Sequence, residues 1–295
     1  MRVEWFLFHV ASGHAYFSGL ALISVAVAIA SFRAKMAWRP VGALLLVGVL
    51  LVAISATPAP WFVTLLLVLA IVAWLIAESR RVTLPPRRLR LARIAAALSI
   101  VVAIALETPY HLRPRLEPQA GARLAVIGDS VTAGIGENEA VTWPQLVARS
   151  HSIEVNDVSE MGATVKSAQK QADRLDADDT IVVLEIGGND LLGETSVKDF
   201  ATELERLLRR VCVPGRTVVM FELPLPPSFN AYGRIQRRLA GQYRVELIPK
   251  RVLMSVLTGP GATLDTIHLS QAGHDRFAEA VWRVIGGAFA DEKRR

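Results

Sequence analysis

Four short motifs in the second half of the chain carry side chains that could together perform acyl transfer. They are Gly128-Asp129-Ser130, Glu160-Met161-Gly162-Ala163, Gly187-Gly188-Asn189-Asp190 and Asp265-Thr266-Ile267-His268. A serine hydroxyl is a poor nucleophile until a base removes its proton, and a carboxylate can fix the tautomer of a histidine base. The residue types therefore predict Ser130 as nucleophile, His268 as base and Asp265 as the group that orients the imidazole.

The same motifs offer donors for the negative charge that develops on an attacked carbonyl oxygen. Preorganised N–H groups stabilise such an oxyanion. The predicted donors are the backbone N–H groups of Ser130 and Gly162 and the side-chain amide of Asn189. Each motif alone is a weak signal, because a loop glycine serves backbone geometry and an Asn-Asp pair often caps a helix. Their order along the chain makes the combination specific.

These motifs need a scaffold that brings them to one place. From residue 123 onward, apolar runs at 124–127, 153–158, 180–186 and 217–221 alternate with helical patterns at 142–150, 164–175, 198–210 and 270–289. Such alternation predicts a parallel sheet covered by helices on both faces. Ligands of these sheets bind beyond the carboxyl ends of the strands. The first three motifs directly follow predicted strands, and the fourth precedes the last predicted helix.

At these residues the chain resembles the SGNH hydrolases, also called the GDSL esterase/lipase family. The resemblance covers about residues 122–289 and rests on Ser130, Gly162, Asn189 and His268. It implies a flavodoxin-like three-layer α/β/α sandwich with a parallel sheet. It also implies metal-independent hydrolysis of esters or thioesters through an acyl-Ser130 intermediate. Val131 and Leu269 replace a frequent Leu and a frequent Pro of the family, and neither change removes a catalytic group.

No cofactor and no metal are expected. The single cysteine, Cys212, cannot form an intramolecular disulfide, and it lies in an apolar run typical of an inert buried thiol. No HExxH motif is present. The acidic residues at 173–179 lack the spacing of a calcium-binding loop and are interpreted as a solvated surface.

The first 107 residues are predicted to form a membrane region. The whole chain is 52% hydrophobic with a mean hydropathy of +0.36, which is too apolar for one ordinary soluble domain. About four transmembrane helices are predicted, at residues 15–32, 41–56, 61–77 and 91–106. The fourth is the weakest, because only 13 residues separate Arg93 from Glu107, and a surface-lying amphipathic helix is its alternative. If it spans, Arg93 is expected to snorkel toward the interface.

A proline-containing linker is predicted at residues 108–121, followed by a hydrolase domain at 122–295. Basic residues gather in the loops at 33–39 and 80–93 and are absent from the turn at 57–60. The positive-inside rule then places these two loops in the cytoplasm. With a fourth span, the hydrolase domain would be extracytoplasmic, in a multi-pass protein of a bacterial inner or plasma membrane.

The charge distribution limits the partners. Residues 1–118 carry a net charge of +8 and residues 119–295 a net charge of −2, so the basic character lies among the apolar segments. Nucleic acid is therefore excluded as a partner. The expected partners are the lipid bilayer and an acyl-ester substrate, which could be a small molecule, a lipid or a glycan; the oligomeric state is left open.

The favoured hypothesis is a membrane-anchored serine esterase or lipase-type hydrolase acting on an envelope lipid or an acylated polysaccharide. Two alternatives stay open at this point. The first is an acyltransferase, in which a second hydroxyl intercepts the acyl-Ser130 intermediate. The second is a non-catalytic binding module on a membrane scaffold, which the combination of Ser130, His268 and Asp265 disfavours.

Overall fold

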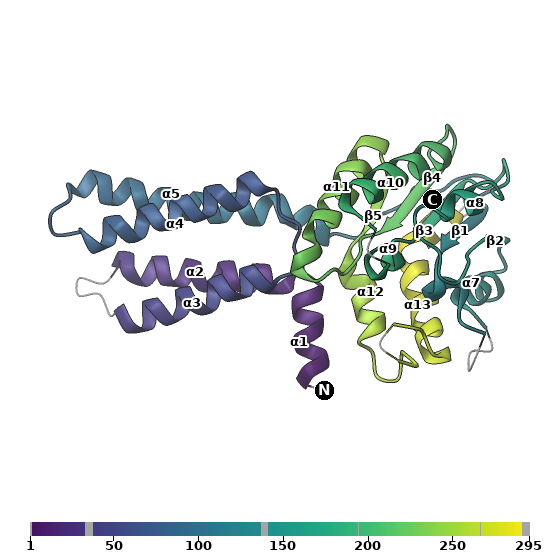
Figure 1. Ribbon diagram of the computed structural model, residues 1–295, viewed down its shortest axis with the longest axis horizontal. Coiled ribbons are helices and arrows are strands. Elements are labelled where there is room, and N and C mark those ends of the chain that lie inside the picture. Colours follow the sequence, from purple (N-terminus) through teal and green to yellow (C-terminus); the bar gives the residue numbers. More distant parts are fainter. Residues whose placement is uncertain (1, 33–37, 137–140, 194, 266, 291–295) are drawn as a thin grey trace. The chain divides into compact units, whose positions relative to one another are not determined.

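A computed structural model of the chain describes residues 2–32, 38–136, 141–193, 195–265 and 267–290. The chain divides into two compact units (Figure 1), and each is considered by itself. The helical unit comprises residues 9–111 and 226–230. The α/β unit comprises residues 112–225 and 231–290, together with residues 2–8.

The helical unit is built from long apolar helices. The N-terminal helices of the chain are α1 (Arg2–Ala11), α2 (His14–Phe32), α3 (Trp38–Ile54), α4 (Trp61–Ser79) and α5 (Pro86–Glu107), followed by a 3-10 turn, η1 (Thr108–His111). Prolines precede the first turns of α4 and α5, where their missing N–H costs no helical hydrogen bond. Helix α1 was not predicted from the sequence.

Helices α2 and α3 cross closely at two glycines. A Cβ atom on Gly19 would lie 2.5 Å from the carbonyl oxygen of Gly48, and one on Gly48 would lie 2.8 Å from the carbonyl oxygen of Gly19. Such close approach through small residues is typical of helices packed within a bilayer, where a large apolar side chain gains little over lipid. The two glycines therefore let the helix backbones touch.

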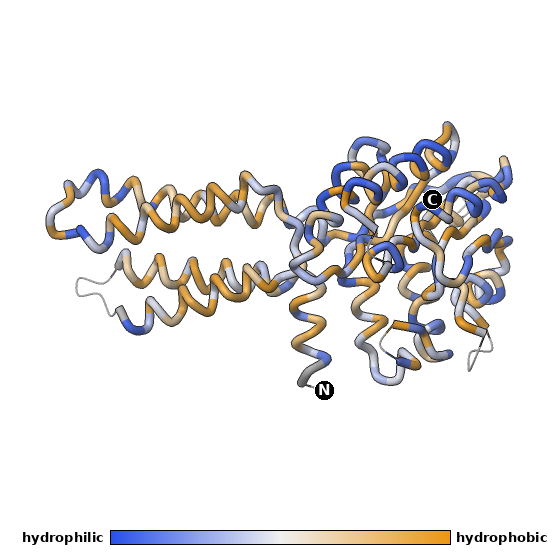
Figure 2. The backbone as a smooth tube through the Cα atoms, in the orientation of Figure 1, coloured by the Kyte–Doolittle hydropathy of each residue, from blue (hydrophilic) through white to orange (hydrophobic). Residues whose placement is uncertain are grey.

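Three described helical stretches are long and apolar enough to cross a membrane. They are His14–Ser31, Trp61–Ser79 and Pro86–His111, with mean hydropathies of 1.6, 2.4 and 2.1, whereas Arg39–Ile54 is apolar but shorter. Figure 2 shows the apolar character along these helices. The helical stretches indicate membrane association. The four-span topology and its orientation stay predictions.

An ion pair joins three helices within the helical unit. Arg93 Nε lies 2.6 Å from Glu78 Oε1, and the other guanidinium nitrogens donate to the carbonyl oxygens of Ser31 and Ala30 at 3.3 and 3.4 Å. The Glu78 side chain is fully enclosed. Arg93 therefore has a buried carboxylate partner, in contrast to a lone arginine that only snorkels, and the pair connects α2, α4 and α5.

The α/β unit contains a five-stranded parallel sheet in the order β2-β1-β3-β4-β5. The strands are β1 (Leu124–Gly128), β2 (Val155–Asp157), β3 (Ile181–Glu185), β4 (Thr217–Phe221) and β5 (Glu246–Ile248). In the register of the sheet, Leu124 lies beside Ile181 and Ile181 beside Thr217. The runs of β-branched and apolar residues in β1 and β3 are fully buried, as expected for strands covered on both faces.

Helices cover both faces of the sheet (Figure 1). The helices that follow β1 along the chain are α6 (Ser130–Ala133), α7 (Trp143–His151), α8 (Ala168–Ala172), α9 (Gly188–Leu192), α10 (Val197–Val211), α11 (Asn230–Tyr243), α12 (Lys250–Leu257) and α13 (Gln271–Ile285), with 3-10 turns η2 (Pro227–Phe229) and η3 (Gly286–Phe289). Alternate strand residues such as Leu124 and Val126 pack with α7, α12 and α13 in one core cluster. Helices α8, α10 and α11 cover the opposite face. The predicted three-layer α/β/α sandwich is confirmed.

The structure differs from the predicted helical pattern at residues 164–175. Helix α8 is restricted to Ala168–Ala172, because the preceding residues form a turn. The N–H of Thr164 donates to Ser167 Oγ at 2.9 Å, and the N–H of Val165 donates to Asp190 Oδ2 at 2.8 Å. Side-chain acceptors of this kind offer the backbone an alternative to helical hydrogen bonds.

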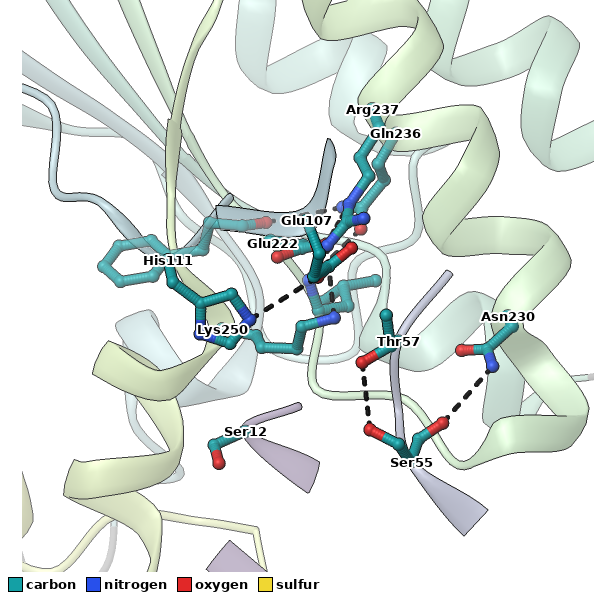
Figure 3. A network of polar contacts seen from close by, with 12 residues as sticks. Ser12, Ser55, Thr57, Glu107, His111, Glu222, Asn230, Gln236, Arg237 and Lys250 are labelled. Atoms are coloured by element: carbon teal, nitrogen blue, oxygen red, sulfur yellow. Dashed lines mark hydrogen bonds and ion pairs between the residues drawn. The ribbon is translucent and has the colours of Figure 1, made fainter. Parts of the chain in front are cut away.

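A buried charged cluster fixes α11 and α12 to the end of β4 (Figure 3). Arg237 Nε lies 2.6 Å and Lys250 Nζ 3.3 Å from Glu222 Oε1, and all three side chains are almost completely buried. Gln236 Oε1 accepts the N–H of Leu223 at 3.1 Å. Removal of one charge from such a buried cluster is costly, so the cluster holds these helices in a defined position.

Candidate active site

The first and third motifs meet where the strand order reverses. Strand β1 lies between β2 and β3, so the connections that leave β1 and β2 run in opposite directions along the sheet. This topological switch point is where open α/β sheets bind ligands. Ser130 begins α6 just after β1, and Asn189 lies in α9 just after β3.

The conformation of the first motif follows from its residue types. Asp129 is the N-cap of α6, and its Oδ1 accepts the N–H of Val131 at 3.0 Å. A Cβ atom at Gly128 would lie 2.6 Å from Thr132, so only glycine fits below this turn. Ser130 is therefore held at the first position of a short helix beyond the carboxyl end of β1.

The second and third motifs are bonded to each other and to the first. The N–H of Glu160 donates to the carbonyl oxygen of Gly128 at 3.1 Å. Asn189 Nδ2 donates to the carbonyl oxygen of Ala163 at 3.0 Å. Because an amide nitrogen carries two hydrogens, Asn189 retains one donor for a ligand. Gly162 has a φ of +74°, a conformation that favours glycine.

The fourth motif forms a compact pair of titratable side chains. His268 Nδ1 lies 2.7 Å from Asp265 Oδ2, while Asp265 Oδ1 accepts the N–H groups of Ile267 and His268 at 2.7 and 2.9 Å. These hydrogen bonds hold the pKa of Asp265 well below its usual range. With the hydrogen on Nδ1 directed to the carboxylate, Nε2 is the basic nitrogen of the imidazole.

The fourth motif interacts electrostatically with the first. The charge of His268 lowers the pKa of Asp129, the residue directly before Ser130. Gly188 lies on another side of the same aspartate, since a Cβ atom there would be 3.4 Å from Asp129 Oδ2. Among the residues that the structure describes, no hydrogen bond joins Ser130 to His268. Catalytic hydrogen bonds are often long in ligand-free sites and shorten when substrate binds.

A buried hydrogen-bond network below Ser130 was missed in the sequence. Thr132 Oγ1 donates to Glu185 Oε2 at 3.0 Å, and Trp143 Nε1 donates to Thr132 Oγ1 at 3.2 Å. The backbone N–H of Trp143 in turn donates to His274 Nδ1 at 3.2 Å. The signal that could have revealed the network is Glu185 itself, an acidic residue within the apolar run of β3.

Burial perturbs the carboxyl groups of this region. Desolvation raises the pKa of Asp129 to about 6, although the hydrogen bond from Val131 lowers it. Desolvation, and then the charge of Asp129, raise the pKa of the fully buried Glu185 well above its usual range. Burial also raises the pKa of Asp190. Strongly perturbed carboxyls at the end of a sheet are typical of a functional site.

The described residues contain no group of three or more His, Cys, Asp or Glu side chains arranged to hold a metal ion. Cys212 is partly buried, and desolvation raises the pKa of its thiol to about 11. Asp179, from the acidic segment, is buried and accepts hydrogen bonds from Asn156 Nδ2 at 2.8 Å and from the N–H of Asp176 at 2.7 Å. Its role is therefore structural, and the interpretation of this residue as part of a solvated surface was wrong.

Comparisons with known proteins point to one family. A sequence model of the GDSL-like lipase/acylhydrolase family matches residues 126–276. The esterase TesA of Pseudomonas aeruginosa is 26% identical over 188 residues, covering 58% of this chain and 91% of that protein. The arylesterase of Vibrio mimicus is 27% identical over 159 residues, covering 50% and 79%. The structure of the psychrotrophic esterase EstA from Pseudoalteromonas sp. agrees in fold, with a TM-score of 0.50 at 18% identity over 56% of this chain and 96% of that one.

Proposed function

The chain belongs to the GDSL-like lipase/acylhydrolase family and is a carboxylic ester hydrolase, and from this premise we propose that it is a membrane-anchored serine esterase with Ser130 as nucleophile. The observation that carries the proposal is the 2.7 Å contact between His268 Nδ1 and Asp265 Oδ2. It supplies an oriented base, and the charge of His268 acts on the residue next to Ser130. The three roles of nucleophile, base and orienting carboxylate are thus provided for.

In the first half-reaction, Ser130 Oγ forms a bond to the ester carbonyl carbon while His268 Nε2 takes the hydroxyl proton. Asp265 stabilises the resulting imidazolium. The tetrahedral intermediate then expels the alcohol, which receives the proton from His268, and leaves an acyl-Ser130 ester. In the second half-reaction, His268 takes a proton from water as the water oxygen attacks the acyl carbon, and it returns that proton to Ser130 as the acid leaves.

The proposed oxyanion donors are the backbone N–H groups of Ser130 and Gly162 and the side-chain amide of Asn189. The hydrogen bond from Asn189 to Ala163 supports this arrangement, because it ties the amide to the residue next to Gly162. Fixed donors need little reorganisation as charge develops on the carbonyl oxygen, and each is worth about 3–4 kcal/mol in comparable sites.

Exposed apolar side chains next to the site residues support a lipid-like acyl ester as substrate. Met161 precedes Gly162 and is 66% exposed, Leu192 follows Asn189 by three residues and is 70% exposed, and Ile267 precedes His268 and is 38% exposed. Apolar surface of this kind suits an acyl chain better than the polar rings of a polysaccharide. The apolar helices support an envelope lipid as the source of that chain. The extracytoplasmic placement of the α/β unit is part of the proposal and rests on the distribution of basic residues in the loops.

Fluorophosphonate labelling of tagged cells tests the nucleophile. Labelling is expected for the wild type and for Ser150→Ala, which alters an exposed serine on α7, and it is expected to be lost in Ser130→Ala and His268→Ala. Labelling by a membrane-impermeant probe would place the site outside the cytoplasm, whereas labelling by a permeant probe alone would place it inside. A folded wild type that neither probe labels would overturn the proposed role of Ser130 as an activated nucleophile.

The substrate class is tested with esters that differ only in the acyl chain. For Leu192→Ser, kcat/KM is expected to fall about tenfold or more for a long-chain p-nitrophenyl ester and to change little for the acetate, because about 25 cal/mol is lost per Å² of apolar contact. An equal fall for both esters, or faster cleavage of acetylated polysaccharide than of lipid esters by the wild type, would exclude the lipid-type substrate.

A further inference from the structure

Two carboxyl groups lie against each other beneath the proposed nucleophile. Asp129 and Glu185 are 3% and 2% exposed, and their carboxyl groups lie within hydrogen-bonding reach of each other. Their backbones are also joined, since the N–H of Asp129 donates to the carbonyl oxygen of Glu185 at 3.2 Å. Two carboxylates in contact inside a protein cannot both be ionised at reasonable cost, so the pair holds one proton.

The hydrogen-bond partners indicate which carboxyl holds that proton. Asp129 accepts the N–H of Val131 at 3.0 Å and has a favourable Coulombic interaction with His268. Both interactions favour the ionised form of Asp129. Glu185 accepts the hydroxyl of Thr132 at 3.0 Å and is also favoured in its ionised form by the backbone N–H of Asp129, but both of these donors are neutral. A hydrogen bond from a protonated Glu185 to an ionised Asp129 satisfies both groups with one negative charge.

We propose that Glu185 is a positioning residue that stays protonated through the reaction and donates a hydrogen bond to Asp129, which keeps Asp129 as a carboxylate facing His268. The proposal rests on the proposed roles of Ser130 and His268. The single charge on Asp129 then adds to that of Asp265 in stabilising the imidazolium that forms when Ser130 attacks. A second charge on Glu185 is avoided, because no cation among the described residues would neutralise it.

The groups around the pair are consistent with one negative charge. Asp190, in α9, raises the pKa of Asp129 by charge repulsion, and His268 lowers it. His274, in α13, accepts the backbone N–H of Trp143 at 3.2 Å, and the indole N–H of Trp143 donates to Thr132. Among the described residues, no lysine or arginine side chain forms a hydrogen bond or ion pair with Asp129 or Glu185. A cation that would hold both carboxyls ionised is thus missing from this part of the chain.

Replacement of Glu185 by a neutral donor tests the proposal. In Glu185→Gln, the amide can donate to Asp129 and accept from Thr132, so kcat/KM is expected to stay within about threefold of the wild type. The acid limb, which is the fall of kcat/KM at low pH, should lie at the same pH as in the wild type. In Glu185→Leu, Asp129 loses its donor, so kcat/KM should fall at least about tenfold and the acid limb should move to higher pH. A shift of the acid limb to lower pH in Glu185→Gln would overturn the proposal, because it would mean that a charge had been removed. Loss of activity in Glu185→Gln equal to that in Glu185→Leu would also overturn it.

Infrared difference spectroscopy provides a readout that does not depend on turnover. A carbonyl band of a protonated carboxyl is expected in the folded wild-type protein at pH 8 and should be missing in Glu185→Gln. Absence of the band from the wild type would refute a protonated Glu185 even if Glu185→Leu fails to fold. Fluorophosphonate labelling of the same samples keeps the two proposals apart, since unlabelled wild-type protein with the band would contradict the role of Ser130 and leave the protonation of Glu185 standing.

Discussion

Replacement of Asp129 by asparagine should raise the stability of the folded protein and lower its kcat/KM. Asp129 is 3% exposed, and burial raises its pKa from 3.8 to about 6. The folded protein therefore holds this proton more tightly than the unfolded chain does. Between pH 3.8 and 6 the native state binds more protons, so the contribution of Asp129 to stability falls as the pH rises through this window.

The size of the effect follows from the shift. About 2 pKa units at about 1.4 kcal/mol each correspond to a destabilisation of about 3 kcal/mol that is complete above pH 6 and absent below pH 3.8. In Asp129→Asn, the amide oxygen can still accept the N–H of Val131, and no charge is buried. The variant should therefore be more stable than the wild type by up to about 3 kcal/mol at pH 8, and equal to it near pH 3.5.

Denaturant unfolding of the detergent-solubilised protein, followed at pH 3.5, 5 and 8, measures this difference. Asp178→Asn is a matched control, because the Asp178 side chain is 80% exposed and its removal should change stability by less than about 1 kcal/mol. The kcat/KM of Asp129→Asn should fall about tenfold or more, since the carboxylate no longer stabilises the charged form of His268. No gain at pH 8, or an equal gain at pH 3.5, would refute the reasoning.

Three further outcomes are expected. Asp265→Asn should lower kcat about 10²- to 10⁴-fold with little change in KM, because His268 loses the partner that fixes its tautomer, and normal activity toward a p-nitrophenyl ester would contradict this role. Arg93→Ala should lower the unfolding temperature in detergent, since a buried Glu78 carboxylate without its partner costs about 3–5 kcal/mol of stability. Glu78→Gln in the same background should restore part of the loss. An unchanged Tm would show that the pair is not buried. Cys212, with a thiol pKa of about 11, should react with maleimide at pH 8 far more slowly than free cysteine, and rapid labelling would show that the thiol is not desolvated.

The strongest sequence signals were those with a direct physical cause. The run at 180–186 has the β-branched and apolar residues of a strand buried on both faces, and β3 lies within it. The spacing of Asp265 and His268 predicts a carboxylate that orients the imidazole, and the two side chains are in contact in the structure. The catalytic roles of these residues stay predictions.

Other elements carried no local signal. Strand β5 has three residues and begins with a glutamate, so neither its length nor its pattern distinguishes it from a loop. The network of Glu185, Thr132 and Trp143 joins residues from three elements that are distant in sequence. Hydrogen bonds of this kind depend on tertiary packing, and a periodicity or motif in one segment cannot predict them.

In the loop that carries Asp265 and His268, the Asp265 carboxylate is hydrogen-bonded to groups of the same loop. One oxygen of Asp265 takes two backbone N–H groups of the loop and the other takes the imidazole, so base and carboxylate form a small self-contained body. Movement of the loop would carry both groups together and leave their mutual geometry intact. Substitutions at the base of the loop should then change the fraction of molecules in which His268 reaches Ser130, and not its basicity. The loop itself thus sets the geometry between Asp265 and His268. The rest of the α/β unit sets how this pair is placed relative to Ser130.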